Sequence, residues 1–471
     1  MKRLNLFLLL AMLISNLTFA GGLLTNTNQN VAFLRNPCRD ASIGIDGVYN
    51  NPAGLNFMSQ GWHLSLNFQS VYQNRAIDTQ NPNYKYGKEN NGSDTKRFKG
   101  KASAPVVPSL QLAYVKDRWA VSASFAITGG GGKCTFDNGL GTFENVVSML
   151  PSAVNKMTQE KYGHKFIDTY SADMYMKGKQ YYYGMQLGAG YKITDNLSAY
   201  VGGRLILADC NYYGYMENIM LQTNAIAQGA GLPAEVPIGY FLGNENPLSN
   251  GIRLDCDQSG WSFMTVLGLD YKIEKWNFAA KYEFYGRMHL KNQSNLTQKY
   301  VDGLAVLNPA AGAALGEFVD GKKVSADVPS LLTFGVQYSI LPKLRASVGY
   351  HHFFDKHASQ YNHKEQYLDE GTNEYLAGVE YDINKMVTAS LGFQSTNYGF
   401  GKNCKFLKDI SYTTNSCSLG GGAEIRLSPK ARLNVAYFHT FYKDLKNAQT
   451  GYTDTYSRTN DVFGLGLDLD F

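Results

Sequence analysis

The chain has 471 residues, of which 44% are hydrophobic and 13% aromatic, and its formal net charge is +5 at pH 7. A charge this small for the length gives no case for a nucleic-acid-binding protein, which needs concentrated basic patches. The 33 Tyr and 48 Gly exceed what a soluble domain normally carries, and they suit aromatic girdles at a membrane interface and close packing of strands.

The amino terminus has the form of a secretory signal peptide. Two basic residues, an apolar run and a small-residue cleavage site follow one another in the segments Lys2–Arg3, Leu4–Ile14 and Thr18–Ala20. We therefore expect residues 1–20 to be removed on export. No later stretch approaches the roughly 18 to 20 continuous apolar residues of a membrane-spanning helix, so the mature chain is expected to be secreted, periplasmic or an outer-membrane barrel.

From residue 62 onward, apolar side chains recur at every second position, which predicts β-strands. The first strand begins with Trp62, Leu64, Leu66 and Phe68 on one face. Pairs of strands around short turns follow at 106–116 with 118–128, 181–193 with 195–208, 260–273 with 276–290, 329–340 with 343–355, 372–383 with 386–396 and 416–428 with 430–442. A last strand covers 459–471. The total is about 14 strands, each near the 9 to 11 residues that cross a bilayer at a tilt.

A sheet in a membrane must close on itself, because unpaired backbone amides are too costly in hydrocarbon. The predicted fold is therefore an all-β, antiparallel transmembrane barrel covering residues 62–471. Strands end on a tyrosine just before a short charged turn at Tyr114, Tyr191, Tyr271, Tyr338 and Tyr381, as is typical of a membrane-water interface. The long connections, including 74–105, 129–180, 209–259 and 291–328, are expected outside the cell, with the short turns in the periplasm.

Residues 21–61 precede the first strand and have no clean alternation. We expect them to form a plug inside the barrel, with short helices in the long outer loops completing the fold. The alternative is a disordered periplasmic tail, which is disfavoured because residues such as Phe33, Leu34 and Val48 make the segment too apolar for solvated disorder.

This segment also carries a family resemblance. FLRNPCRDASIGIDGVYNNPAGL, from Phe33 to Leu55, resembles the N-terminal hatch of the FadL-type transporters of long-chain fatty acids, whose hatch ends in an Asn-Pro-Ala element. Here that element is Asn51, Pro52 and Ala53, followed by Gly54. APVVPSLQLAYVKDRWAVSASFAITGGGG, from Ala104 to Gly132, is similar to the second and third strands of the family.

The resemblance implies an outer-membrane barrel that is plugged by its own amino terminus and passes hydrophobic molecules. The cargo, long-chain fatty acids or aromatic hydrocarbons, would be captured by an outer groove, moved to an internal site and released sideways or past a rearranged hatch. The rival readings are a nonspecific porin and a surface adhesin or receptor. The implied partners are a hydrophobic small molecule, outer-membrane lipid and, through the C-terminal Phe471, the barrel assembly machinery; we expect a monomer.

Two long loops contain apolar residues at helical spacing, which predicts an apolar outer groove. A helix start is also predicted where Asn308 precedes Pro309. The expected substrate-binding residues of the groove are Phe143, Val147 and Leu150 in one loop, and Met216, Ile219 and Met220 in the other. The alternative is that these helices only cover the barrel mouth.

Alternation also places a set of charges on the lumen side. The basic members are Arg204, Lys281, Arg345 and Arg426, and the acidic ones are Asp270, Glu283, Glu380 and Glu424. A fatty carboxylate needs a cation inside an apolar pocket, so Arg204 and Lys281, which lie farthest from the periplasmic turns, are candidates for head-group binding. The favoured alternative is that lumen charges pair with one another or with the hatch.

Histidines and cysteines add weaker signals. His351, His352, His357 and His363 cluster near one outer loop, but neighbouring His351 and His352 should face opposite sides of a strand, which favours a pH-responsive loop tip over a metal site.

Cys210 with Cys256, and Cys404 with Cys417, bracket outer loops and could form disulfides, which would leave Cys38 for Cys134. The chain shows no catalytic motif, so we expect neither an enzyme nor a cofactor or metal.

Overall fold

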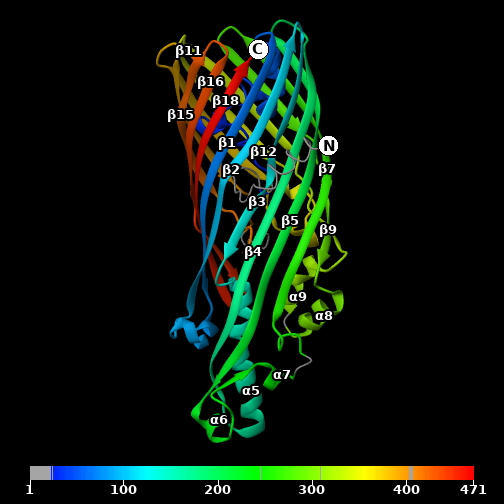
Figure 1. Ribbon diagram of the computed structural model, residues 1–471, viewed down its shortest axis with the longest axis vertical. Helices are drawn as coiled ribbons and strands as arrows, with labels where there is room; N and C mark the ends of the chain where they lie inside the picture. The colour runs from blue at the N-terminus through cyan, green and yellow to red at the C-terminus, as the bar shows by residue number, and fades with distance from the viewer. Residues whose placement is uncertain (1–22, 24, 244–245, 308, 402–406) are drawn as a thin grey trace, which may run out of the picture.

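The computed structural model describes residues 23, 25–243, 246–307, 309–401 and 407–471. The predicted signal peptide, residues 1–20, lies outside them. Within the described residues, fourteen long antiparallel strands form one closed barrel, which confirms the predicted fold (Figure 1). They are β1 Gly61–Gln80, β2 Thr95–Lys116, β3 Trp119–Phe136, β4 Ile167–Lys192, β5 Leu197–Thr223, β7 Ile252–Ile273, β8 Trp276–Glu283, β11 Leu331–Leu341, β12 Leu344–Phe353, β13 Thr372–Asp382, β14 Val387–Asn397, β15 Ser416–Ser428, β16 Ala431–Tyr442 and β18 Tyr452–Asp470.

The barrel closes where β1 pairs with β18 along its whole length, from His63 opposite Asp470 to Gln80 opposite Thr453. Short strands extend the wall at its outer end: β6 Glu235–Pro237, β9 His289–Ser294, β10 Lys323–Ser325 and β17 Leu445–Gln449. The predicted strand 276–290 is thus divided into β8 and β9. Because each of the fourteen long strands pairs with a long strand on either side, the sheet closes on itself.

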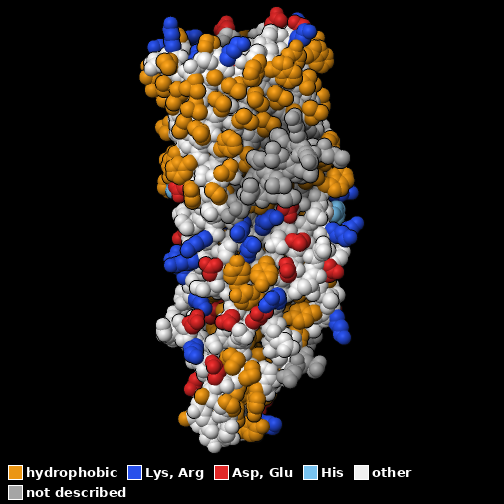
Figure 2. All heavy atoms as spheres, in the orientation of Figure 1, with side chains coloured by type: hydrophobic (Ala, Val, Ile, Leu, Met, Phe, Trp, Pro, Cys, Tyr) orange, Lys and Arg blue, Asp and Glu red, His pale blue; other side chains and the backbone are white. Residues whose placement is uncertain are grey.

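Alternation along β1 sorts its side chains into a lipid face and a lumen face. Trp62, Phe68 and Tyr72 are exposed on the outside, whereas the intervening polar residues, such as Asn67 and Gln69, are buried inside. From Trp62 to Tyr72 a strand rises about 33 Å along its own axis, or roughly 24 Å of height at a 45° tilt. This matches the apolar band of about 25 Å in transmembrane barrels, and Figure 2 shows the band around the end that carries the short turns.

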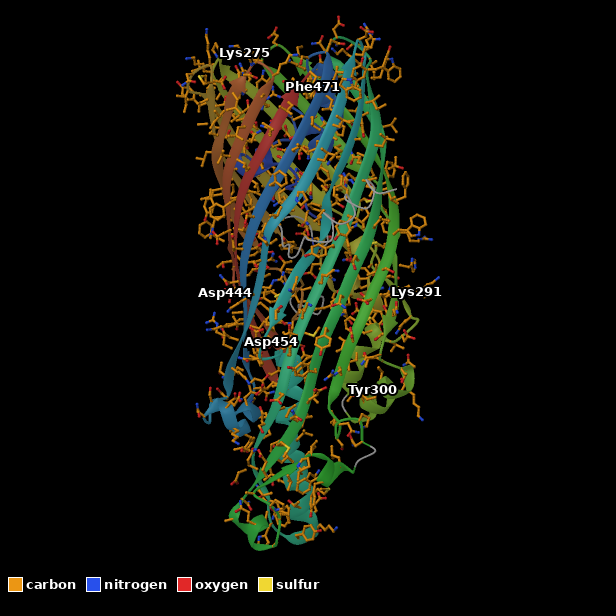
Figure 3. The ribbon with its side chains drawn as sticks, viewed as in Figure 1. Lys275, Lys291, Tyr300, Asp444, Asp454 and Phe471 are labelled. Carbon is orange, nitrogen blue, oxygen red and sulfur yellow. The ribbon has the colours of Figure 1, made fainter. Side chains whose placement is uncertain are left out.

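Aromatic pairs mark the boundary of this band. The predicted girdle tyrosines Tyr114, Tyr191 and Tyr338 pack against tryptophans of neighbouring strands, Trp62, Trp119 and Trp276, with ring centroids 4.7, 4.7 and 4.2 Å apart. Lys275 and Phe471 lie at this end and Tyr300 toward the other (Figure 3). In barrels of bacterial outer membranes the end with short turns faces the periplasm, so it is called the periplasmic end below, and the other the outer end.

Several strands continue beyond the apolar band, so that parts of the predicted loops are strand instead. Helices fill the rest of the outer end: α4 Gly141–Ser148, α5 Leu150–Tyr162, α6 Ala225–Gly229, α7 Gly239–Leu242, α8 Gln298–Leu307 and α9 Pro309–Leu315, with the 3₁₀ turns η2 Pro82–Tyr86, η3 Lys88–Asn90, η4 Gly316–Phe318, η5 Asp355–His357 and η6 Tyr361–Tyr367. None of the helices in the described residues is long and apolar enough to cross a membrane. The predicted cap Asn308 lies outside the described residues.

One of the helical predictions is wrong. Met216, Ile219 and Met220 belong to β5, where Asn218 has a positive φ of 52° and the register with β4 shifts between Ser171 and Asp173. A bulge of this kind moves the inward phase of a strand by one residue. Met216 and Ile219 are therefore both buried although they are three residues apart, a spacing that in sequence imitates a helix.

The segment before β1 lies inside the barrel and is called the hatch. It contains the short helices α2 Val31–Arg35 and α3 Gly47–Asn50 and the 3₁₀ turn η1 Pro52–Phe57. Asn30 caps α2 by accepting a hydrogen bond from the amide of Ala32. Nearly all its residues from Thr25 to Asn56 are buried, and apolar ones such as Phe33 and Leu34 pack against Phe438 and Val462 of the wall.

Candidate functional site

Buried ion pairs hold the hatch against the wall near its periplasmic end. The Arg35 guanidinium lies 2.9 Å from Glu380 and 3.2 Å from Glu424, and Arg39 lies 2.8 Å from Asp46 and 2.9 Å from Glu380. Separating such pairs would leave uncompensated buried charges, which is strongly unfavourable. The predicted lumen carboxylates Glu380 and Glu424 thus serve to anchor the hatch.

The Asn-Pro-Ala element docks the hatch on β7. The Asn51 side-chain amide donates to the Leu269 carbonyl at 3.1 Å and to Asp270 at 3.0 Å, and Pro52 begins η1, where its missing N–H costs nothing. Ala53 is fully buried in a cluster with Tyr200 and Val266. At Gly54 a side chain would begin 3.1 Å from the Asp270 carboxylate. The element is therefore a close-packed contact with the wall.

Arg204 and Lys281, the candidates for head-group binding, are already occupied. Arg204 lies 2.5 Å and Lys281 2.7 Å from Glu283, and all three side chains are buried. Lys281 also donates to the Tyr49 carbonyl of the hatch at 3.0 Å, and Arg204 stacks on the Tyr49 ring. Neither lines a cavity described below. These contacts agree with the alternative, in which the lumen charges pair with one another and with the hatch. The assignment of Arg204 and Lys281 to head-group binding is corrected accordingly.

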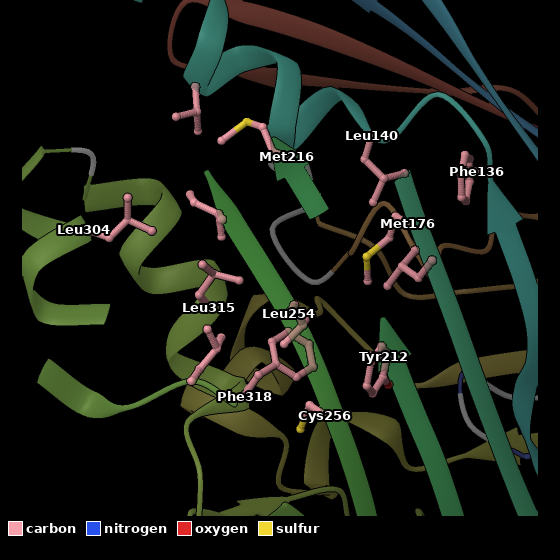
Figure 4. Packing of buried hydrophobic residues seen from close by; sticks show 14 of the residues in the cluster. Phe136, Leu140, Met176, Tyr212, Met216, Leu254, Cys256, Leu304, Leu315 and Phe318 are labelled. Carbon is pink, nitrogen blue, oxygen red and sulfur yellow. The ribbon is translucent and has the colours of Figure 1, made fainter. Parts of the chain in front are cut away.

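An apolar pocket lies at the outer end between α4, β5, β7 and α9. Its volume is about 40 Å³, and its lining includes Phe143, Met216, Leu254 and Leu315; Figure 4 shows the surrounding apolar cluster. We call it the outer pocket. Of the predicted groove residues, Phe143 and Met216 line it. Val147, Leu150 and Ile219 are buried in the apolar cluster around it, and Met220 lies farther along β5 opposite Pro237.

A second cavity, the inner cavity, lies inside the barrel between the outer loops and the hatch. Its volume is about 100 Å³, and its basic lining residues, Arg75, Lys364, Lys408 and Arg458, outnumber the single acidic one, Glu317. Its aromatic lining consists of Tyr182, Tyr212, Tyr361, Tyr398 and Tyr412. The inner cavity is therefore polar, aromatic and positively charged.

None of these basic residues was predicted as a site residue. Arg75 is in phase with the lumen-facing residues of β1, but it lies beyond the apolar band, in the range 74–105 that the sequence predicts to be an outer loop. Following the alternation past that band would have placed Arg75 inside the barrel. Lys364 and Lys408 lie in outer loops, where no periodicity points to the lumen.

A pair of aromatic rings packs beside the inner cavity. Tyr212 of β5 and Phe318 of η4 pack with ring centroids 4.9 Å apart. Tyr212 lines the inner cavity, and Met216, four residues farther out along β5, lines the outer pocket. Figure 4 shows both rings, together with Leu315, in the apolar cluster between the helices and the strands.

The barrel wall is interrupted between β2 and β3 beside the inner cavity. The register of the pair breaks off at Leu110 opposite Phe125 and resumes only at Lys101 opposite Thr135. On β2 this stretch contains Pro105 and Pro108, which lack the N–H that a ladder needs. On β3 it contains the glycine run 129–132, in which Gly130 and Gly132 have φ of +93° and +69°. Gly130 also lines the inner cavity.

The beginning of the hatch covers this interruption from inside. Thr25 forms an antiparallel bridge with Gly129, and the Asn26 amide donates to the Thr128 carbonyl at 2.9 Å. The Gln29 side chain donates to the Ile127 carbonyl at 2.8 Å. Residues 25–29 thus pair with residues 127–129, a part of the stretch of β3 that β2 leaves unpaired.

The predicted disulfide between Cys210 and Cys256 is absent. Both thiols are free and buried, because β5 and β7 pair with Cys210 opposite Gln258 and Cys256 opposite Tyr212, an offset that puts the two sulfurs out of reach. Cys38 and Cys134 are likewise free and buried, and Cys417 is free and exposed. Its predicted partner Cys404 lies outside the described residues.

The histidine cluster does not form a loop tip as a whole. His351 is buried in β12 and lies 3.0 Å from Asp40 of the hatch and 2.8 Å from Glu374 of β13, so it contributes to anchoring the hatch. His352 faces the other side and lies 2.8 Å from Asn373, and His357 and His363 are exposed in the outer loop. In the part of the chain that the structure describes, no group of His, Cys, Asp or Glu could hold a metal ion.

By sequence, the chain matches no family model and no curated protein. By structure, it is similar to a Pseudomonas aeruginosa FadL homologue, with a TM-score of 0.62 and 16% identity over 96% of this chain and 100% of that one. The Pseudomonas putida toluene transporter TodX gives 0.52 and 16% over 91% and 94%, and the Ralstonia pickettii toluene transporter TbuX gives 0.50 and 17% over 93% and 98%. The chain therefore has the fold of the FadL-type outer-membrane channels.

Proposed function

We propose that this protein is an outer-membrane channel for the passive uptake of hydrophobic compounds, with long-chain fatty acids as its cargo. The observation that carries the proposal is the succession of the outer pocket, the inner cavity and the interrupted wall between β2 and β3. Together they form a route from the outer end into the barrel and sideways out of it, while the hatch blocks a straight aqueous path. The toluene transporters that share the fold support a hydrophobic cargo, and the resemblance of the hatch sequence to that of the FadL-type fatty acid transporters supports an acyl chain.

Staged sites suit a hydrophobic cargo for an energetic reason. Burial stabilises a hydrocarbon chain by about 0.8 kcal/mol per methylene, so an acyl chain of roughly 16 carbons gains about 12 kcal/mol. One perfect site would release such a ligand far too slowly. Two small cavities, of about 40 and 100 Å³, each cover only part of a chain and allow it to pass in steps.

The exit that this geometry favours is lateral. Gly130 belongs both to the inner cavity and to the unpaired stretch of β3, so cargo in the cavity already lies beside the opening. Residues 25–29 of the hatch must move away, which breaks the hydrogen bonds to Ile127 and Thr128. The ion pairs of Arg35 and Arg39 lie elsewhere on the hatch, so its beginning can move while the rest stays anchored.

The proposal is tested by uptake of radiolabelled palmitate into cells that have no other channel for it. In the double variant Phe143→Asp, Met216→Asp, two carboxylates enter the outer pocket, where burial without partners costs several kcal/mol. Uptake is expected to fall about tenfold or more, on the basis that each 1.4 kcal/mol is a factor of ten. Met157→Asp is the matched control, since Met157 lies exposed on α5.

Folding of every variant is checked by the mobility of the unheated barrel on a gel. Unchanged uptake by a folded double variant would contradict the route through the outer pocket. Uptake of neither palmitate nor toluene by the unsubstituted protein, or a steady ion conductance in planar bilayers, would contradict the proposed function itself.

A further inference from the structure

Two buried arginines face each other in the wall of the inner cavity. Arg75 of β1 and Arg458 of β18 are direct register partners at the seam where the barrel closes. Both line the cavity, and their exposed fractions are only 4% and 7%. They lie beyond Tyr72, the last apolar residue of the lipid face of β1, and so just outside the membrane-spanning part of the strand.

Neither arginine has an anionic partner among the described residues. Arg75 donates to the Gln73 side chain at 2.7 Å and to the Ile410 carbonyl at 3.0 Å. Arg458 donates to the Tyr412 carbonyl at 3.4 Å, while its buried Nε has no hydrogen-bond partner. Both guanidinium groups lie over tyrosine rings, Tyr412 and Tyr442 respectively.

This arrangement differs from that of the other buried arginines. Arg35, Arg39 and Arg204 each lie within 3.2 Å of at least one carboxylate. Two like charges that are buried side by side repel each other and pay a desolvation cost, which no carboxylate of the described residues offsets here. An anion between them would remove both penalties, because a guanidinium fork matches the geometry of a carboxylate.

The other charged groups of the cavity leave its surplus of positive charge intact. Lys408 lies 2.6 Å from Glu317 and is neutralised by it. Lys364 is half-buried in η6 and adds a further positive charge. The cavity of about 100 Å³ is smaller than the roughly 150 Å³ that holds one benzene molecule in an apolar protein cavity, so it has room for a head group but not for a long hydrophobic body.

We propose that Arg75 and Arg458 form an anion site that binds the acidic group, a carboxylate or sulfonate, of an amphiphilic cargo. The inference rests on the proposed function and adds to it the residues that recognise the acidic group of the cargo. The hydrophobic body then extends past Tyr212 and Phe318 toward the outer pocket. A neutral hydrocarbon would leave both arginines uncompensated, so the site selects against it.

Calorimetric titration of the full-length protein in a non-ionic detergent tests the site. The probes are dodecanoate, dodecyl sulfonate, 1-dodecanol and acetate. Dodecanoate and dodecyl sulfonate are expected to bind more tightly than 1-dodecanol. Arg75→Gln and Arg458→Gln should each weaken dodecanoate binding about 10- to 100-fold, the range expected for lost hydrogen bonds to a charged group, and leave 1-dodecanol within about twofold. Arg432→Gln, at the periplasmic end beside Asp470, should change neither.

A second measurement separates an anion site from a structural role. Because the empty site holds two repelling charges, Arg458→Gln should raise the melting temperature of the ligand-free barrel, whereas Arg204→Gln should lower it. Equal affinity for dodecanoate and 1-dodecanol, or a lowered melting temperature in Arg458→Gln, would overturn the proposal. Acetate binding as tight as dodecanoate would overturn its assignment to cargo. If toluene or dodecanol is still taken up in any of these cases, the proposed function stands without the anion site.

Discussion

The buried cluster around Glu283 allows a quantitative test of how the hatch is held. Glu283 accepts from Arg204 at 2.5 Å and from Lys281 at 2.7 Å, and the exposed fractions of the three side chains are 1%, 1% and 3%. In Glu283→Gln the side chain keeps its size, but two buried cations lose the carboxylate with which both pair. Removing one partner of a buried ion pair typically costs about 3–5 kcal/mol, so we expect the free energy of unfolding to fall by about that amount.

The assay is guanidinium unfolding of the barrel in phospholipid vesicles, followed by the fluorescence of its 4 tryptophans. Asp195→Asn is the matched control, because its pairing with Arg118 across 3.7 Å lies in exposed turns and should contribute little. A triple variant with methionine at residues 204, 281 and 283 should recover much of the loss, since well-packed apolar residues can replace a buried ion cluster. A loss in Glu283→Gln no larger than that of the control would refute the reasoning.

Two further predictions concern the inner cavity. In Gly130→Val the new side chain would begin 2.6 Å from the Gln180 carbonyl at a φ of +93°. We therefore expect palmitate uptake by cells to be slower, while dodecanoate binding to the purified protein stays unchanged. Weakened binding would show that Gly130 shapes the cavity and not the exit. Burial and the positive charge of Lys408 lower the pKa of Lys364 to about 8, while Glu317 opposes this shift. Lys364 therefore loses its charge as the pH rises through 8, and dodecanoate should bind less tightly at pH 9 than at pH 7; the same pH dependence in Lys364→Met would contradict this assignment.

The sequence determined the secondary structure of the wall and the sides of its strands. Whether a residue such as Phe68 faces lipid or Asn67 faces the lumen depends only on its position in a period of two, which is a local property of the chain. The hatch could likewise be predicted from the sequence, because an apolar segment without alternation must be buried away from water. The same local reasoning wrongly predicted a helix at Met216 and Ile219. A bulge at Asn218 changes which residues of the strand point inward, and the amino-acid sequence there does not indicate a bulge.

Only the tertiary structure decided which groups meet. Arg75 and Arg458 come from the two ends of the barrel sequence and become neighbours only because β1 and β18 close the sheet in one register. The pairing of β7 with both β5 and β8 likewise brought Arg204 close to a carboxylate of β8, and the hatch supplied a ring for it to stack on, which removed it from the candidates for cargo binding. A charge on the lumen face is a local fact, but whether it is paired depends on residues far away in the chain, and that distinction separates an anchor of the hatch from a site for an anion.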